Sequence, residues 1–199
     1  MFSWLRSLIK RPEPPSVPPL DPEQPQSSAP RSFACKCCGD IHTGLPDVTH
    51  RRPDAILLLD ANARDSCFEN SDGCVIPAGV AGPTAKYFLR GVMEFPFIGD
   101  GAAMQERFGF GLWAEVTLEH FESVIECEPG CAASHFQGIV ATELPAIEHS
   151  TGVPLHIEHR EHGQRPFFFV NDPDHELARL QSEGISLDKA FAIIHAAGL

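Results

Sequence analysis

The segment 87–98 constrains the fold most, because it is the longest stretch of the chain in which every second residue is apolar. In a β-strand, successive side chains point to opposite faces of the sheet. One face of this segment is almost entirely apolar and consists of Tyr87, Leu89, Gly91, Met93, Phe95 and Phe97. The other face carries Arg90 and Glu94. The segment is therefore predicted to be a strand whose first face packs on the core.

Further strands are expected on both sides of this one. Residues 108–116 predict a strand whose two interior glycines indicate a bulge or a close backbone approach. We expect it to pair with 87–98 as an antiparallel partner. Shorter strands are expected at 74–76 and 135–141, and a hairpin is expected from 155–162 and 166–170.

Helical signals concentrate later in the chain. Apolar residues recur at helical spacing from Leu118 to Glu126, with Thr117 as N-cap. Asp172 and Pro173 are expected to open a helix that ends at Gly184. Ser186 is expected to cap a final helix with an apolar face of Leu187, Ala190, Phe191 and Ile194. Because the strands mostly precede the helices, the predicted fold class is α+β: a mainly antiparallel sheet with a few packed helices, two of them C-terminal.

Three regions are expected along the 199 residues. Residues 1–11 form a short amphipathic basic segment, read either as a membrane-surface or partner anchor or as a frayed terminus. Residues 12–32 contain many prolines and predict a disordered, extended linker. Residues 33–199 are predicted to form a single α+β domain that opens with a zinc-ribbon-like cysteine knuckle.

Charge and hydropathy limit the partners and the compartment. The formal net charge is -12, from 15 basic and 27 acidic residues. No basic run follows residue 11, so no nucleic-acid partner is expected, and an unknown protein or small molecule fits better. Neither an export segment nor a long apolar span is present, so a cytoplasmic location is predicted.

Clustered cysteines in a reducing compartment more often mark a metal site than a disulfide. The segment Cys35-x-x-Cys38-Gly39-x-x-His42 has the spacing of a metal knuckle. We predict a structural zinc ion held by Cys35, Cys38, His42 and Cys74. The alternative completion is Cys127 with Cys131, a second pair around a Pro-Gly turn. A redox-active dithiol, buried structural thiols or a relic site that has lost its metal are the other readings of the same spacing.

A histidine-rich segment also has the regular spacing of a metal site, but its pattern fits a solvent-exposed strand better. His156, His159 and His162 recur every three residues. On a strand, His159 would point away from the other two.

Five further residues stand out because they are polar or aromatic within apolar landmarks. They are candidates for a binding cleft: Arg90, Glu94, Trp113, Arg165 and His175. The competing interpretation is a set of structural ion pairs and caps, with Trp113 in the core.

The order of the landmarks resembles a bacterial family named domain of unknown function 2199, over residues 33–198. The resemblance rests on the cysteine segment with Leu45-Pro46, and on the following motifs in order: Cys74-Val75-Ile76, Phe88-Leu89-Arg90-Gly91, Glu94-Phe95-Pro96, Phe110-Gly111-Leu112-Trp113, Phe136-x-Gly138, Leu144-Pro145, Arg165-Pro166 and Pro173-Asp174-His175-Glu176-Leu177-Ala178. Cys37, Cys67, Cys127, Cys131 and the loop 77–84 depart from the family pattern. The resemblance implies a fold but no reaction.

Two functions are compatible with these observations. The first is a non-enzymatic binding or regulatory module of the bacterial cytosol with a structural zinc knuckle. The second is a small hydrolase that uses His175 with Asp174 or Glu94. A hydrolase requires His175, Arg90 or Arg165 to converge in one concave pocket.

Overall fold

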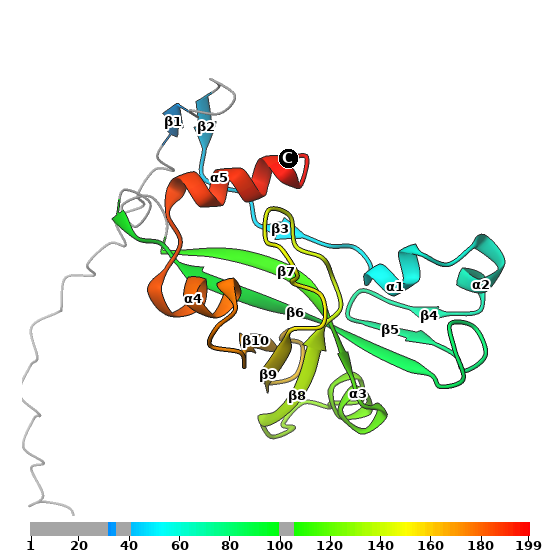
Figure 1. Ribbon diagram of the computed structural model, residues 1–199. Helices are drawn as coiled ribbons and strands as arrows, with labels where there is room; N and C mark the ends of the chain where they lie inside the picture. Colours follow the sequence, from blue (N-terminus) through cyan, green and yellow to red (C-terminus); the bar gives the residue numbers. More distant parts are fainter. Residues whose placement is uncertain (1–31, 35–40, 100–105) are drawn as a thin grey trace, which may run out of the picture.

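The computed structural model describes residues 32–34, 41–99 and 106–199, and its centre is a closed barrel of five strands (Figure 1). The barrel strands are β6 (Lys86–Pro96), β7 (Arg107–Val116), β8 (Ser134–Val140), β9 (Pro154–His159) and β10 (Phe167–Val170). Each strand is antiparallel to the next along the chain. The pairing expected between 87–98 and 108–116 is confirmed, because β6 and β7 pair from Tyr87 with Val116 to Pro96 with Arg107.

The barrel closes where β10 returns to β6. In an up-and-down run of five strands, the first and the last point the same way, so the closing pair must be parallel. Phe167 accordingly pairs with Val92 in parallel register, and the Val92 N–H donates to the Pro166 carbonyl at 2.9 Å.

The predicted α+β class is wrong, because the sheet closes on itself and the described part of the chain is mainly sheet. The two C-terminal helices are present as α4 (Glu176–Glu183) and α5 (Leu187–Ala196), but neither exceeds 10 residues. Alternation along a strand shows which face is buried, but not which distant edge pairs with it.

Additional strands extend the barrel sheet. The strand β5 (Gly73–Ile76) runs antiparallel to the first half of β6, and it also pairs with β4 (Phe68–Glu69). On the other side, β3 (Val48–Thr49) runs parallel to β7. Two short helices, α1 (Asp54–Leu57) and α2 (Ala61–Asp65), lie near β4 and β5 (Figure 1). A separate hairpin consists of β1 (Ser32–Ala34) and β2 (Ile41–Thr43).

The barrel interior is the main core. Leu89, Met93 and Phe95 are completely buried, which confirms the predicted core face of β6. Aromatic side chains fill much of the interior, and the Phe108 and Phe110 rings pack edge to face with centroids 5.4 Å apart. Apolar residues of α4 and α5 join the same cluster.

A second, smaller core lies against the other face of β6. It contains Phe88 and Trp113 together with Cys74, Ile56, Ile76 and Ala141. The Trp113 indole N–H donates to the His50 carbonyl at 3.1 Å, so this buried ring has its polar group satisfied.

Helix ends follow local side-chain chemistry. Thr117 caps α3 (Leu118–Ile125) and Ser186 caps α5, both as predicted. Gly184, with a φ of 96°, ends α4. The predicted start of α4 at Asp172 and Pro173 is wrong. The Asp172 carboxylate accepts instead from the Asp174 N–H at 3.1 Å, and His175 becomes the N-cap.

The expected division at residue 32 remains a prediction. Residues 1–31, which carry the amphipathic segment and most of the linker, lie outside the described residues.

Gly91 allows β10 to approach β6 closely. A Cβ atom at position 91 would lie 2.2 Å from the Phe168 ring. We expect Gly91→Ala to lower the free energy of unfolding by about 1–3 kcal/mol, the usual cost of overpacking a core. Urea denaturation measures this loss. In a Phe168→Leu background the penalty should shrink, and strictly additive effects of the two substitutions would contradict the close approach.

Candidate functional site

A cleft of about 610 Å³ opens where one edge of β6 changes its partner strand. The Arg90 N–H donates to the Asp72 carbonyl, at the start of β5, and two residues later the Val92 N–H donates to the Pro166 carbonyl, at the start of β10; both bonds are 2.9 Å. Because β5 is antiparallel and β10 parallel to β6, the two strands begin here and diverge. The cleft is thus built by the backbone topology of the barrel.

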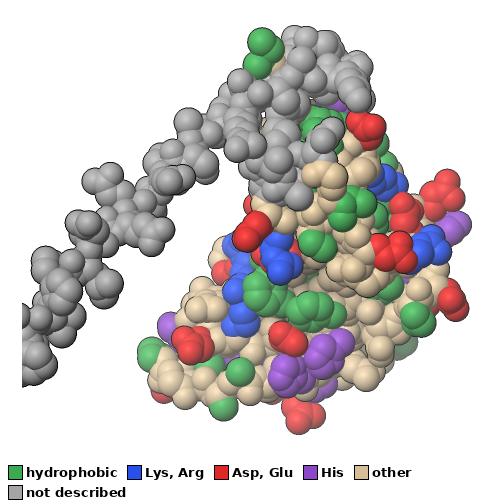
Figure 2. All heavy atoms as spheres, turned by 90° about the vertical axis from the view of Figure 1, so that its left-hand side faces the viewer, with side chains coloured by type: hydrophobic (Ala, Val, Ile, Leu, Met, Phe, Trp, Pro, Cys, Tyr) green, Lys and Arg blue, Asp and Glu red, His purple; other side chains and the backbone are tan. Residues whose placement is uncertain are grey.

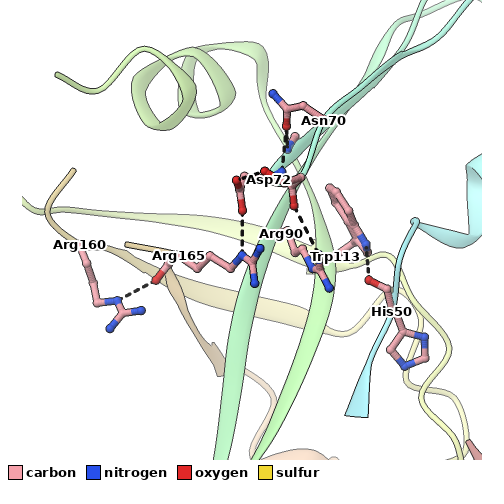
Figure 3. Close-up of polar contacts among 9 residues, drawn as sticks. His50, Asn70, Asp72, Arg90, Trp113, Arg160 and Arg165 are labelled. Carbon is pink, nitrogen blue, oxygen red and sulfur yellow. Dashed lines mark hydrogen bonds and ion pairs between the residues drawn. The ribbon is translucent and has the colours of Figure 1, made fainter. Parts of the chain in front are cut away.

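Two arginines from distant parts of the chain meet in this cleft (Figure 3). The Arg165 Nε donates to the Asp72 carboxylate at 2.8 Å. Within the described part of the chain, the Arg90 side chain makes one long hydrogen bond, from Nη1 to the Ser71 carbonyl at 3.5 Å. Its buried Nε has no hydrogen-bond partner among the described residues. The Arg90 guanidinium also lies 6.0 Å from the centroid of the Trp113 ring.

Asp72 is held at the tip of the β4–β5 hairpin. The Asn70 side-chain oxygen accepts from the N–H groups of Asp72 and Gly73, at 2.9 and 2.6 Å. This Asx turn fixes the backbone that presents the carboxylate. The Ser71 hydroxyl donates to the same carboxylate.

Like charges and burial both act on the arginines. Burial lowers the pKa of Arg90, the charge of Arg165 lowers it further, and Asp72 raises it. A third arginine, Arg160, also lines the cleft; its Nε donates to the Arg165 carbonyl at 2.7 Å, and its guanidinium lies 3.9 Å from the centre of the Phe167 ring. Three arginines and one carboxylate, that of Asp72, therefore line the cleft of an otherwise acidic chain. The cleft can attract an anion.

Of the five residues predicted for a cleft, the structure brings Arg90 and Arg165 together. Glu94 instead forms an ion pair with Arg107, at 3.7 Å. Trp113 is completely buried in the second core. His175 caps α4, where its Nδ1 accepts from the Leu177 N–H at 3.1 Å. These three side chains do not line the cleft.

Sequence reasoning missed Asp72 and Arg160. The local signal for Asp72 was the polar turn that ends at Gly73. Its partner Arg165 lies 93 residues away, so the pairing itself had no local signature.

The predicted zinc ligands fall in different environments. Cys35 and Cys38 lie outside the described residues, and so does the side chain of His42 on β2. Cys74 lies on β5, far from β2 in Figure 1, and is only 1% exposed. Burial, followed by the charge of Glu69, raises the pKa of the Cys74 thiol to about 12, which favours a neutral thiol over a metal-binding thiolate. The knuckle at residues 35–38 remains a prediction.

Two other groups of described residues have donor atoms close enough to hold a metal. One consists of Cys127, Cys131 and His159, and the other of His135, His156 and Glu158. Cys127 and Cys131 form a disulfide, whereas the sequence offered this pair as the alternative completion of the zinc site. Metal-binding geometry is therefore available, but at positions other than the predicted four.

The three regularly spaced histidines separate as a strand requires. His159 is 4% exposed and faces inward, whereas His156 faces outward and stacks on His135 with ring centroids 5.3 Å apart. His162 lies beyond the end of β9, in an exposed turn, with its Nδ1 2.6 Å from the Cys127 carbonyl oxygen. On the face shown in Figure 2, a group of histidines lies toward the lower end, and acidic side chains lie both beside it and over the rest of the face.

Together the fold and the cleft define a small β-barrel protein with an arginine-lined cavity. The family model described as "Uncharacterized protein conserved in bacteria (DUF2199)" matches residues 34–185, and the chain belongs to this family. No curated protein and no solved structure matches the chain. In the described ranges, no helix has the length and apolar character needed to cross a membrane.

The Asp72–Arg165 ion pair should be visible in an acid titration. Burial alone would raise the pKa of Asp72, but hydrogen bonds from Ser71 and Arg165, with the charges of Arg165 and Arg90, bring it below the ordinary 3.8. A lowered pKa means that the pair stabilises the fold above about pH 4, and that this stabilisation disappears as the pH falls through the lowered pKa. NMR of the Asp72 carboxyl carbon should give a midpoint below that of urea-unfolded protein. The midpoint should rise in Arg165→Gln, and an unchanged midpoint there would contradict the pairing.

Proposed function

We propose that this protein is a non-enzymatic binding module whose cleft holds a small anionic molecule bearing a carboxylate or phosphate group. The observation that carries this proposal is the meeting of Arg90 and Arg165 in one cavity with Asp72 as the one carboxylate of its lining. The cavity volume of about 610 Å³ is within the range of small-molecule sites. The chain as a whole is acidic, so a local group of arginines in a cleft favours the binding of a negatively charged ligand there.

The arginines are suited to grip an anion from two sides. A guanidinium presents its N–H groups in a planar fork that matches carboxylate and phosphate oxygens. The ion pair with Asp72 engages the Nε of Arg165, and so orients its guanidinium before a ligand arrives. Among the described residues, the Arg90 side chain makes one long hydrogen bond, from Nη1 to the Ser71 carbonyl at 3.5 Å, so its terminal N–H groups can still donate to a ligand. Binding would also relieve the repulsion between the two guanidinium groups.

The hydrolase alternative receives less support from the geometry. His175 uses its Nδ1 to cap α4, and Glu94 pairs with Arg107, so neither contributes to the arginine cleft. The remaining elements of the proposal are a structural zinc knuckle at Cys35 and Cys38 and a cytoplasmic location, which rest on the sequence alone.

Phosphate and a short dicarboxylate are the first probes for this site. Either anion should raise the unfolding temperature of the wild-type protein relative to chloride at equal ionic strength, since a ligand that binds only the folded state stabilises it. Calorimetry should show that Arg90→Gln and Arg165→Gln each weaken the affinity roughly 10–100-fold, the loss expected for a charge-assisted hydrogen bond.

Arg179→Gln is the matched control, because Arg179 is an exposed arginine on α4 away from the cleft. It removes the same charge from the chain and should leave the affinity unchanged. Equal weakening by all three substitutions would point to general electrostatic attraction, and no binding of either anion to the wild-type protein would refute the choice of ligand class.

A further inference from the structure

A tight turn after α3 brings two cysteines together at the wall of the cleft. The Cys131 N–H donates to the Glu128 carbonyl at 3.0 Å, and Gly130 has a φ of 93°. Pro129 and Gly130 are the residues that such a turn requires at its two central positions. The Cα atoms of Cys127 and Cys131 lie 5.8 Å apart, and the two sulfurs are joined as a disulfide.

His159 approaches this pair from the end of β9. One ligand atom from each of Cys127, Cys131 and His159 lies within 4.8 Å of the other two. The His159 side chain is almost fully buried beside the two sulfurs, and a neutral imidazole is a common metal ligand. The Ser134 hydroxyl lies 3.5 Å from its Nδ1, in place to orient the ring as partners of metal-bound histidines do.

We infer that Cys127, Cys131 and His159, in the reduced protein, form a binding site for a thiophilic divalent cation such as Zn²⁺. Two thiolates and an imidazole are the donors that zinc favours, and three protein ligands leave a fourth position for water or another ligand. Cys127 and His159 both line the arginine cleft, so the cation would bind at the wall of that cavity.

The two sulfurs can either form the disulfide or, as thiolates, bind the metal, but they cannot do both at once. Reduction by an added phosphine consumes water and yields phosphine oxide and two thiols, which lose their protons on binding the cation. The disulfide form lacks the thiolates that bind metal. The test of this site does not depend on the proposed anion binding, because it is made with the metal alone.

Cobalt provides the direct test, since thiolate–Co²⁺ bonds give a charge-transfer absorption. The full chain carries Cys35→Ser, Cys37→Ser and Cys38→Ser, so that a knuckle at residues 35–38 contributes no signal. After phosphine reduction, the protein should bind one equivalent of Co²⁺ with this absorption, and added Zn²⁺ should displace it. The disulfide form should show no such absorption.

Ligand variants locate the site. Cys127→Ser and His159→Gln should each raise the Kd for Co²⁺ more than about 100-fold, beyond the 10–100-fold typical of losing an outer-sphere partner. Cys67→Ser is the control, because this partly buried thiol packs against the second core and is not one of the proposed ligands, and it should leave the Kd unchanged. Circular dichroism checks that each variant folds.

If His159→Gln does not fold because His159 is buried, the two cysteine variants on the turn, Cys127→Ser and Cys131→Ser, test the site instead. Absence of the absorption in the reduced protein, or its survival in both cysteine variants, would overturn the inference and leave a disulfide only.

Discussion

The sharing of one edge of β6 between two strands is the constraint on which the site depends. β6 is 11 residues long, and β7 pairs with it along nearly the whole of its other edge. β5 pairs with residues 86–89 of the remaining edge, and β10 joins the same edge next to it, at Val92, and closes the barrel. Buried backbone N–H groups need acceptors, and the carbonyls of Asp72 and Pro166 supply them for Arg90 and Val92.

The chemistry of the cleft follows from this change of partner. The side chains just before β5 and β10 are Asp72 and Arg165, and they are forced together because both strands start at the same point. Arg90 lies beside this pair on β6, on the face opposite the barrel interior. Closure of the barrel therefore brings the positions of Arg90, Arg165 and Asp72 together. The disulfide turn after α3 and the β9–β10 turn complete the walls of the same cavity.

Sequence patterns between neighbouring residues predicted individual strands and helix ends well, but they did not predict which distant strands pair with one another. Alternation in 87–98 identified the buried face of β6, and Thr117, Gly184 and Ser186 marked helix ends, because these features depend on neighbours in sequence. The barrel was missed because the pairing of Phe167 with Val92 depends on contacts between distant segments. Arg90 and Arg165 were selected as charged residues within apolar surroundings, yet the same criterion also selected Glu94, Trp113 and His175, whose local pairing, packing and capping explain them.

Hydrogen exchange at the Val92 amide tests the closure of the barrel most directly. This N–H donates to Pro166 and reports the one pairing that joins the last strand to the first. If closure holds the fold together, the amide should exchange only through global unfolding, with an opening free energy equal to that from urea denaturation. Exchange through a much smaller opening free energy, while β6–β7 amides such as that of Met93 remain protected, would mean that β10 detaches independently and would contradict the account.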